Sequence, residues 1–317
     1  MTCHNCVVEC KKAGKRSDGL QRYRCAQCGK TFSDRKEFGW TGHKQAVNDT
    51  RAFLALAMIA EGNSINSAKR ISGLDKKTIM NLLMIAGAKC EMLLAEKIRN
   101  VPVNDVQADE IWSFVGKKEA NTQYGDRYDA VGDAWCFIGI ERTTKMVLAF
   151  ELGKRTVASA TRFISKLANA TDPDQRFQLT TDGLKAYPYP IGNILGDRVD
   201  YAQLIKIYKY TEPEAARRYS PAKFAESFST PVYGNPDEER ICTSHVERQN
   251  GSLRQWCKRL TRLTYAFSKK WEHHRAALAF HFAYYNFCRI HSTTRKTPAQ
   301  AAGIAEKPWT ISELLAA

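Results

Sequence analysis

The 317-residue sequence has no run of the roughly 18 apolar residues that a membrane-spanning helix requires. Its beginning, Met-Thr-Cys-His-Asn-Cys, also lacks the apolar core of a secretory signal peptide. We therefore expect a cytoplasmic protein without a membrane partner. A disulfide framework is disfavoured, because disulfides persist mainly in oxidising compartments. The length is sufficient for two or three domains, each with its own core.

Acidic residues are scarce at both ends of the chain. Residues 1–105 carry 18 Lys/Arg against 10 Asp/Glu, and residues 243–317 carry 12 against 4, so each end has a net charge of +8. Residues 106–242 are nearly neutral, with 18 against 19. Basic ends around a neutral middle are typical of a catalytic core that its flanks hold on a polyanion, although a generic basic surface gives the same balance. We expect nucleic acid as the partner.

Two cysteine pairs stand in the basic N-terminal part. They are Cys3-x2-Cys6 and Cys25-x2-Cys28, with 18 residues between the pairs. This spacing is typical of a four-cysteine zinc ribbon. Four thiolates complete a tetrahedral site with no open position for chemistry, and Cys10 is left over. We predict a structural Zn²⁺ in a ribbon over residues 1–40.

Short helices are expected next. Apolar spacing and glycine stops predict helices over 51–62, 65–71 and 76–84. Helix, short turn and helix predict a helix-turn-helix DNA-binding domain over 45–100, with an ordinary three-helix packing unit as the alternative. Its expected DNA contacts, at the start of the last helix, are Lys76, Lys77, Thr78 and Asn81.

The neutral middle predicts an α/β core with a mixed sheet over residues 101–265. The expected elements are strands over 106–115, 134–140 and 146–152, a helix over 156–167, and strands over 177–181 and 198–208. Three strands, a helix and a strand follow one another as in a ribonuclease-H-like core. For residues 210–241 we expect only a connecting insertion or loop.

Acids mark two of these strands. Asp109 and Glu110 lie inside the first one, where acids are depleted, and Asp182 ends the fourth. In a ribonuclease-H-like core the fourth strand lies beside the first, which would bring Asp182 near Asp109. The alternative is an edge strand whose acids are simply solvated. Adjacent strand residues point to opposite faces, so Asp109 and Glu110 are not expected on the same side of the sheet.

A helix predicted over 244–260 supplies a third acid, Glu247. Its apolar stripe consists of Val246, Leu253, Trp256, Cys257, Leu260 and Leu263. Another face is polar and carries Glu247, Asn250, Gly251, Arg254 and Lys258. This face either presents Glu247 to a site or is merely solvated, and Gly251 would let a backbone approach closely.

Three carboxylates suit two divalent cations. Mg²⁺ takes oxygen ligands and keeps positions open for water and phosphate oxygens. Two such ions about 3.5–4 Å apart activate an attacking oxygen and stabilise a leaving one. Asp109 would bridge both ions, while Asp182 and Glu247 would each complete one of them. Mn²⁺ is a possible substitute.

Taken together and in order, these motifs resemble those of a DDE-type bacterial insertion-sequence transposase, closest to the insertion-sequence-one family. The resemblance rests on the ribbon, the helix-turn-helix, DEIWSFV from Asp109, LTTDG from Leu179 and VERQNGSLR from Val246. The segments RLTRLTYAFSKK from Arg259 and YYNFCRIHS from Tyr284 are similar to later parts of the pattern. The family often makes its enzyme by frameshifting, whereas this sequence is continuous.

The resemblance implies catalysis by Asp109, Asp182 and Glu247, with 72 and then 64 residues between them. It selects Asp109 over Glu110 as the metal ligand. Further expected DNA contacts are Asn250, Arg254, Lys258 and Arg259. Residues 266–317 form a C-terminal helical segment whose main helix is predicted over 271–287. We expect its Leu278, Phe282 and Tyr285 to pack in the core or against a partner.

The expected function is binding of the terminal inverted repeats of an insertion sequence, phosphodiester cleavage with two metal ions, and strand transfer into target DNA. Such an enzyme would be nucleoid-associated. Pairing two double-stranded ends implies a homodimer or a higher homo-oligomer on DNA. One alternative is a transposase-derived DNA-binding regulator in which the nuclease core is only a scaffold. A nuclease acting on RNA or on junctions is another.

Overall fold

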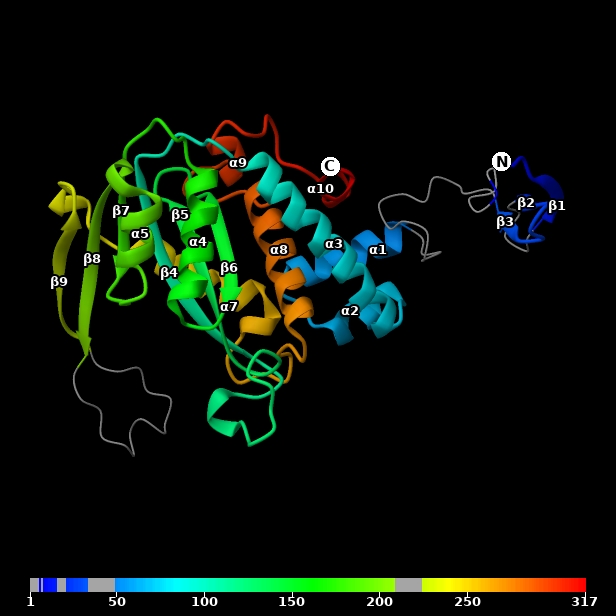
Figure 1. Cartoon of the computed structure of the whole chain (residues 1–317), viewed down its shortest axis with the longest axis horizontal. Helices are drawn as coiled ribbons and strands as arrows, with labels where there is room; N and C mark the ends of the chain where they lie inside the picture. Colours follow the sequence, from blue (N-terminus) through cyan, green and yellow to red (C-terminus); the bar gives the residue numbers. More distant parts are fainter. Residues whose placement is uncertain (1–5, 7, 16–20, 34–48, 209–223) are drawn as a thin grey trace. The chain divides into compact units, whose positions relative to one another are not determined.

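The computed structural model describes residues 6, 8–15, 21–33, 49–208 and 224–317 (Figure 1). Two compact units make up the chain, Met1–Asp49 and Thr50–Leu315. The helices of the expected 45–100 domain therefore belong to the same compact unit as the expected core.

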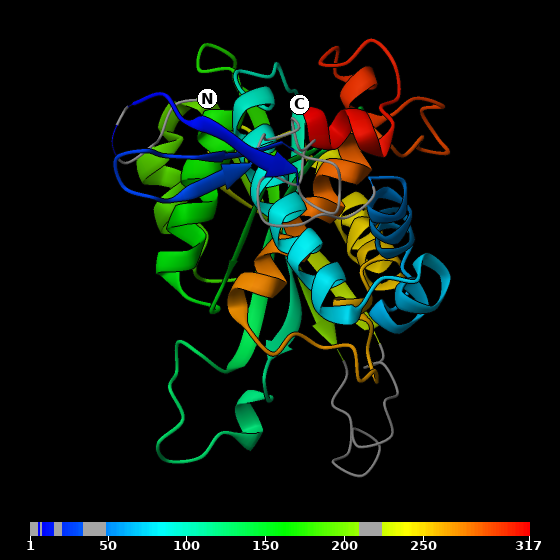
Figure 2. The ribbon, with the colours of Figure 1, turned by 90° about the vertical axis from the view of Figure 1, so that its right-hand side faces the viewer.

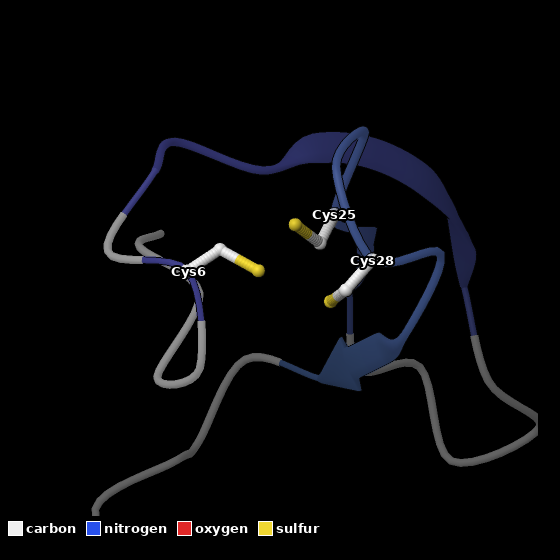
Figure 3. Close-up of side chains that lie close together, drawn as sticks. All are labelled: Cys6, Cys25 and Cys28. Carbon is white, nitrogen blue, oxygen red and sulfur yellow. The ribbon is translucent and has the colours of Figure 1, made fainter.

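The first unit contains a small antiparallel sheet. Its strands are β1 (Lys11–Lys15), β2 (Gln21–Arg24) and β3 (Thr31–Ser33). Between β2 and β3 the chain folds into a tight knuckle, in which the Cys25 amide donates to the Lys30 carbonyl (2.9 Å) and the Gly29 amide donates to the Cys25 carbonyl (3.0 Å). Gly29 has a positive φ of 70°, which glycine adopts without strain. The knuckle directs the Cys25 and Cys28 thiols toward that of Cys6 (Figure 3).

A mixed six-stranded sheet forms the centre of the second unit, in the order β6-β5-β4-β7-β8-β9. The strands are β4 (Asp105–Val115), β5 (Gly132–Glu141), β6 (Val147–Gly153), β7 (Phe177–Asp182), β8 (Val199–Tyr208) and β9 (Phe224–Tyr233). Strands β4, β5 and β6 pair antiparallel, whereas β7 lies parallel to both β4 and β8. This confirms the ribonuclease-H-like order and the predicted pairing of the fourth strand with the first. The β4–β5 connection projects away from the sheet in both views (Figure 2).

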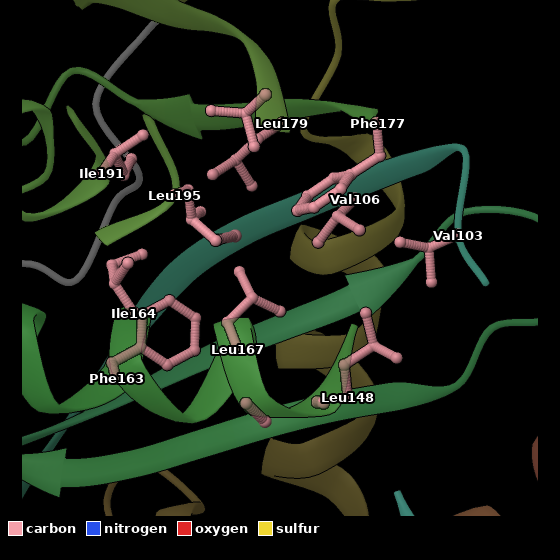
Figure 4. Packing of buried hydrophobic residues seen from close by; sticks show 14 of the residues in the cluster. Val103, Val106, Leu148, Phe163, Ile164, Leu167, Phe177, Leu179, Ile191 and Leu195 are labelled. Carbon is pink, nitrogen blue, oxygen red and sulfur yellow. The ribbon is translucent and has the colours of Figure 1, made fainter. Parts of the chain in front are cut away.

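Helices cover both faces of this sheet (Figure 1). They are α4 (Val157–Ala170) and α5 (Pro188–Ile194) on one face, and α7 (Ser244–Trp256) and α8 (Trp271–Phe287) on the other. On α4, Phe163, Ile164 and Leu167 point into the core (Figure 4) and are fully buried. Each such side chain contributes about 2 kcal/mol of hydrophobic stabilisation. Thr156 begins α4, because its hydroxyl accepts a hydrogen bond from the Ser159 amide.

Three helices precede the sheet: α1 (Asp49–Ala60), α2 (Ile65–Ser72) and α3 (Lys76–Lys97). The turn between α2 and α3 follows its sequence signals, since Gly73 is left-handed and the Asp75 carboxylate accepts from the Lys77 amide (2.8 Å). The last helix extends well beyond the predicted end at residue 84. Gly87 lies inside it at a close crossing with α8, where an added Cβ would lie 2.5 Å from the Ala276 Cα.

Length and composition alone would allow α3 to cross a membrane. The core helix of a domain passes the same test, and the buried side of α3 packs along α8.

Several other elements depart from the sequence predictions. Helix α7 ends at Trp256, so Leu263 lies beyond the expected stripe and is exposed. The expected loop over 210–241 contains the edge strand β9, in which Pro231 is tolerated because an edge strand has one unpaired side. Helix α5 was not expected, and it begins at Pro188, whose fixed φ suits a first turn.

The remaining elements are short. They are the 3₁₀ turns η1 (Glu119–Asn121), η2 (Gly196–Arg198), η3 (Glu238–Arg240) and η4 (Lys258–Leu260), and the helices α9 (Pro298–Ala301) and α10 (Ile311–Ala316). On α8, whose predicted bounds are met, Leu278, Phe282 and Tyr285 are buried as expected.

Candidate functional site

The acids of β4 and β7 meet where β7 ends. The parallel register of the two strands runs as far as the pair Ala108 and Thr181, so the next residue of each strand is an aspartate. One carboxylate oxygen from each of Asp109, Glu110 and Asp182 lies within 4.8 Å of the other two. The structure therefore brings Asp109 and Asp182 together, and adds Glu110 to them. We call these three residues the acid cluster.

Glu110 was expected on the other face of the sheet or at a loop edge, and its carboxylate nevertheless lies close to that of Asp109. The side chains do alternate: Asp109 accepts a hydrogen bond from Asn250 of α7 (2.8 Å), while Glu110 accepts one from Tyr187, at the start of α5 (3.2 Å). However, β7 ends at Asp182, so among the described strands none pairs with β4 at Glu110 on that side. The sheet does not separate the two carboxylates there.

Arg155, just beyond β6, joins the acid cluster from the α4 face. Its guanidinium lies 2.5 Å from Glu110 and 3.8 Å from Asp182. The guanidinium also lies over the Trp135 ring, 4.7 Å from the centroid. This one cation therefore faces two of the three carboxylates.

Burial and mutual repulsion raise the pKa values of the acid cluster. The pKa of Asp109 rises to about 6 through burial and then through the charge of Asp182, although Asn250 opposes the shift. The pKa of Glu110 rises to about 8 through burial and through Asp182 and Asp109, which outweigh the ion pair with Arg155. Burial also raises the pKa of Asp182. The cluster is short of positive charge, because Arg155 offsets only part of this repulsion.

Glu247, the third expected acid, lies next to the cluster and not within it. Its carboxylate accepts hydrogen bonds from Lys206 of β8 and from Thr243, at the N-terminus of α7. The side chain is 44% exposed. Its charge contributes to the raised pKa values of both Asp109 and Asp182. Glu247 is thus close enough to act on the two aspartates but is held by other partners.

The donor atoms of this site fit Mg²⁺. Every side-chain donor in the cluster is a carboxylate oxygen, which hard divalent cations prefer. The Asn250 Oδ1 atom adds another oxygen, since it is buried without a hydrogen-bond partner among the described residues. A divalent cation would also relieve the repulsion that raises the carboxylate pKa values. Asp109, Glu110 and Asp182 are the residues best placed to hold it.

The expected DNA contacts on α3 lie at its N-terminus. Lys76, Lys77 and Asn81 are exposed, and Thr78 is half-buried. They occupy the first two turns, where the unpaired backbone amides of a helix favour an anion. Their reading of DNA remains a prediction.

The expected contacts from α7 onward have partners within the protein. Asn250 is buried against Asp109. Arg254 donates to the carbonyls of Leu260 (3.1 Å) and Trp112 (3.4 Å), and burial lowers its pKa to about 10. Asn250 and Arg254 of the polar face thus pack on β4, whereas Glu247 on the same face is exposed. At Gly251, nothing lies within 4 Å of the missing Cβ and the expected close approach is not made within the chain.

Arg259 also has a partner within the protein, whereas Lys258 borders a cavity. The Arg259 guanidinium donates to the Ser268 hydroxyl (2.9 Å), which also contacts His274 Nδ1 (2.8 Å). His274 in turn contacts the Ser113 hydroxyl of β4 (3.0 Å). Arg259 therefore helps to anchor the segment after α7 to the sheet, whereas Lys258 is half-buried beside a cavity.

A second candidate metal site lies in the first unit. The thiols of Cys6, Cys25 and Cys28 lie within 4.8 Å of one another (Figure 3). Cys3, the fourth ligand expected from the sequence, lies outside the described residues. Cys10 is buried beside Cys25. Three converging thiols are the donors that Zn²⁺ prefers.

Sequence reasoning missed Arg155, Tyr187 and Lys206. Arg155 lies 45 residues from Glu110, and Lys206 lies 41 residues from Glu247. Tyr187 lies in a proline-rich stretch that showed no periodicity. The available signal was the element order, which places β8 next to β7 and the edge strand β6 two strands away from β4.

Comparisons with known proteins give weak likenesses. No protein-family model and no curated protein matches the chain. Among solved structures, the chain is similar to piggyBac transposase in a synaptic complex with hairpin DNA. The two sequences are 12% identical, the match covers 89% of this chain and 72% of that chain, and the TM-score is 0.41. It is also similar to Mos1 transposase in a paired-end complex with the left transposon end, with 15% identity, a TM-score of 0.22, and 54% of this chain and 62% of that chain covered.

A third similar structure is an endonuclease V from Bacillus subtilis, with 15% identity, a TM-score of 0.20, and 43% of this chain and 59% of that chain covered. The chain thus spans less than two thirds of the Mos1 chain in that paired-end complex and of the endonuclease chain. Because these likenesses are weak, we infer function from the sheet and the acid cluster and not from them.

Proposed function

We propose that the protein is a DDE-type DNA transposase that cleaves phosphodiester bonds at the ends of an insertion sequence and joins the resulting 3′-hydroxyls to target DNA. The observation that carries the proposal is the acid cluster at the junction of β4 and β7, with Glu247 of α7 close to it. The sequence motifs resemble those of the insertion-sequence-one family, and we propose membership of that family on this basis.

Within this proposal Asp109 and Asp182 hold Mg²⁺ or Mn²⁺, and Glu247 completes the site once it leaves Lys206. Two bound ions would supply the activation of the attacking oxygen and the stabilisation of the leaving one. Glu110 adds a carboxylate that Tyr187 and Arg155 hold in place. Asn250 orients Asp109 through its amide.

The basic ends would supply DNA binding. Lys76, Lys77 and Asn81 are exposed at the start of α3, and the first unit adds the lysines of β1. Zn²⁺ held by Cys6, Cys25 and Cys28, with Cys3 as the proposed fourth ligand, would stabilise that unit. Binding built on phosphate contacts should weaken steeply as salt rises. Two paired ends would require at least a homodimer on DNA.

The test is a cleavage and strand-joining assay with Mg²⁺ on duplex DNA that carries the two ends of the element. The wild type should release a 3′-hydroxyl at each end and join it to target DNA. Asp182→Ala should abolish both steps. Asp174→Asn removes an exposed acid from a turn away from the cluster and should leave both steps intact.

Equal activity of Asp182→Ala and the wild type would overturn the site. End binding without cleavage by the wild type would favour a DNA-binding regulator, and cleavage of RNA in place of DNA would favour the nuclease alternative.

A further inference from the structure

An open cavity of about 700 Å³ lies beyond the C-terminal end of α7. Its walls come from the α1–α2 turn, the start of α3, the segment 257–270 and α8. This volume is within the range of small-molecule pockets. Next to the lining residue Asn63, Gly62 packs closely against the end of α7, since an added Cβ would lie 2.9 Å from the Gln255 carbonyl oxygen. The cavity is therefore a shaped space between packed elements and not a gap between loops.

The lining is both cationic and aromatic. The cavity is lined by lysines at positions 76, 258, 269 and 270, and none of its described lining residues is Asp or Glu. Trp256, Tyr265, Phe267 and Phe280 supply aromatic rings. Tyr265 is fully exposed. Cations beside stacking rings are the groups that bind a nucleotide, with its anionic phosphate and its flat base.

A polar atom in the wall lacks a partner. His281 is only 5% exposed and lines the cavity, and its Nδ1 makes no hydrogen bond with any described residue. Burial lowers the pKa of His281 to about 3, so the ring is neutral. A buried polar atom without a partner is costly. Because this atom has almost no accessible surface, the lysines and aromatic rings of the lining carry the case for a ligand.

The position relative to the acid cluster fits a single DNA strand. Trp256 follows Glu247 by nine residues of α7, a rise of about 14 Å. This distance corresponds to about four base steps of one strand. Lys76 and Lys258, which the sequence predicted as DNA contacts, both line the cavity.

We propose that this cavity binds a nucleotide of a DNA strand whose base has left the duplex stack, with the base between Tyr265 and the wall that contains His281 and the phosphates on the surrounding lysines. The proposal rests on the proposed function for the identity of the DNA. The cavity would hold the strand a fixed distance from the bond to be cut. Opening of the duplex near the end of the element would then precede or accompany cleavage.

The experiment measures binding by the full chain carrying Asp182→Asn, without divalent metal, so that it does not depend on cleavage. The probes are a fluorescent single-stranded oligonucleotide of about 12 nucleotides and an abasic strand of the same length and charge. We expect about fivefold or greater loss of affinity when the bases are absent. Tyr265→Ala should cause a similar loss for the intact strand and none for the abasic one.

Tyr124→Ala is the matched control, because Tyr124 is also fully exposed but does not line the cavity. Ala266→Trp, which would fill the cavity from a half-buried lining position, should reproduce the Tyr265→Ala result. Equal binding of the intact and abasic strands by the wild type, or equal effects of the two tyrosine substitutions, would overturn the proposal. Deoxyadenosine monophosphate that binds as tightly as the strand would also overturn it, in favour of a free nucleotide. A failed cleavage assay with these binding results intact would count against the proposed function alone.

Discussion

Replacing Glu110 by glutamine should make the protein more stable at neutral pH. Glu110 is buried, and its pKa rises from 4.5 to about 8. A carboxyl group with that shift must stay protonated in the folded protein at pH 7, while it ionises freely in the unfolded chain. The difference disfavours folding by about 3 kcal/mol. Glutamine has the same shape without this cost, and its side-chain oxygen can still accept a hydrogen bond from Arg155.

The sign of the pH dependence follows from the raised pKa. The contribution of Glu110 to stability is fully present below pH 4.5, and it is lost as the pH rises through about 8. The gap between Glu110→Gln and the wild type should therefore be small near pH 4.5 and should widen up to about pH 8.

Urea unfolding in metal-free buffer at several pH values measures this gap. Glu306→Gln, which changes an exposed acid, is the matched control and should show no such widening. A gap that stays constant from pH 5 to pH 8 would refute the placement of Glu110 in a buried, repulsive cluster. Adding Mg²⁺ at pH 7 should stabilise the wild type more than Glu110→Gln, because the metal binds ionised carboxylates.

Four other substitutions have clear expected outcomes. Cys25→Ser should abolish Zn²⁺ binding and unfold the first unit, while the thermal transition of the second unit stays in place; retained zinc, measured after dialysis, would contradict the thiol site. Gly87→Ala should destabilise the protein by about 1–3 kcal/mol in urea unfolding, because the new Cβ meets the α8 backbone. Gly251→Ala, whose new Cβ enters open space, should stabilise the protein by up to about 1 kcal/mol. The reverse order of the two stabilities would refute the α3–α8 crossing. Lys206→Gln should free Glu247 and tighten Mg²⁺ binding severalfold by calorimetry, and weaker binding would show that Lys206 supports the site.

The order of the core elements was predictable because it depends on periodicity. Alternating or continuous apolar residues fixed β4 to β8, and a stripe of large side chains fixed α8 at its observed bounds. Other features depend on tertiary packing. Strand β9 contains Pro231 and many small polar residues, and it forms because β8 offers it an edge. Helix α3 continues through Gly87, which lies at the crossing with α8, and sequence reasoning does not show whether a glycine ends a helix or lets another one approach.

The positions of the two aspartates on the strands were predictable, but the residues that contact the acids were not. Asp109 and Asp182 follow from the pairing of the first and fourth strands, which the element order implies. The alternation rule gave the correct face for the Glu110 side chain, but it could not show that the neighbouring strand ends before that residue. Arg155 and Lys206 act through ion pairs across the sheet, and these leave no spacing in the sequence.

The central claim, that the acid cluster is a divalent metal centre, is tested most directly by anomalous diffraction from crystals of the full chain soaked in Mn²⁺. The account predicts a peak within coordination distance of Asp109 and Asp182 that disappears in the Asp182→Asn variant. An occupied site elsewhere, with no peak at the acid cluster, would contradict it.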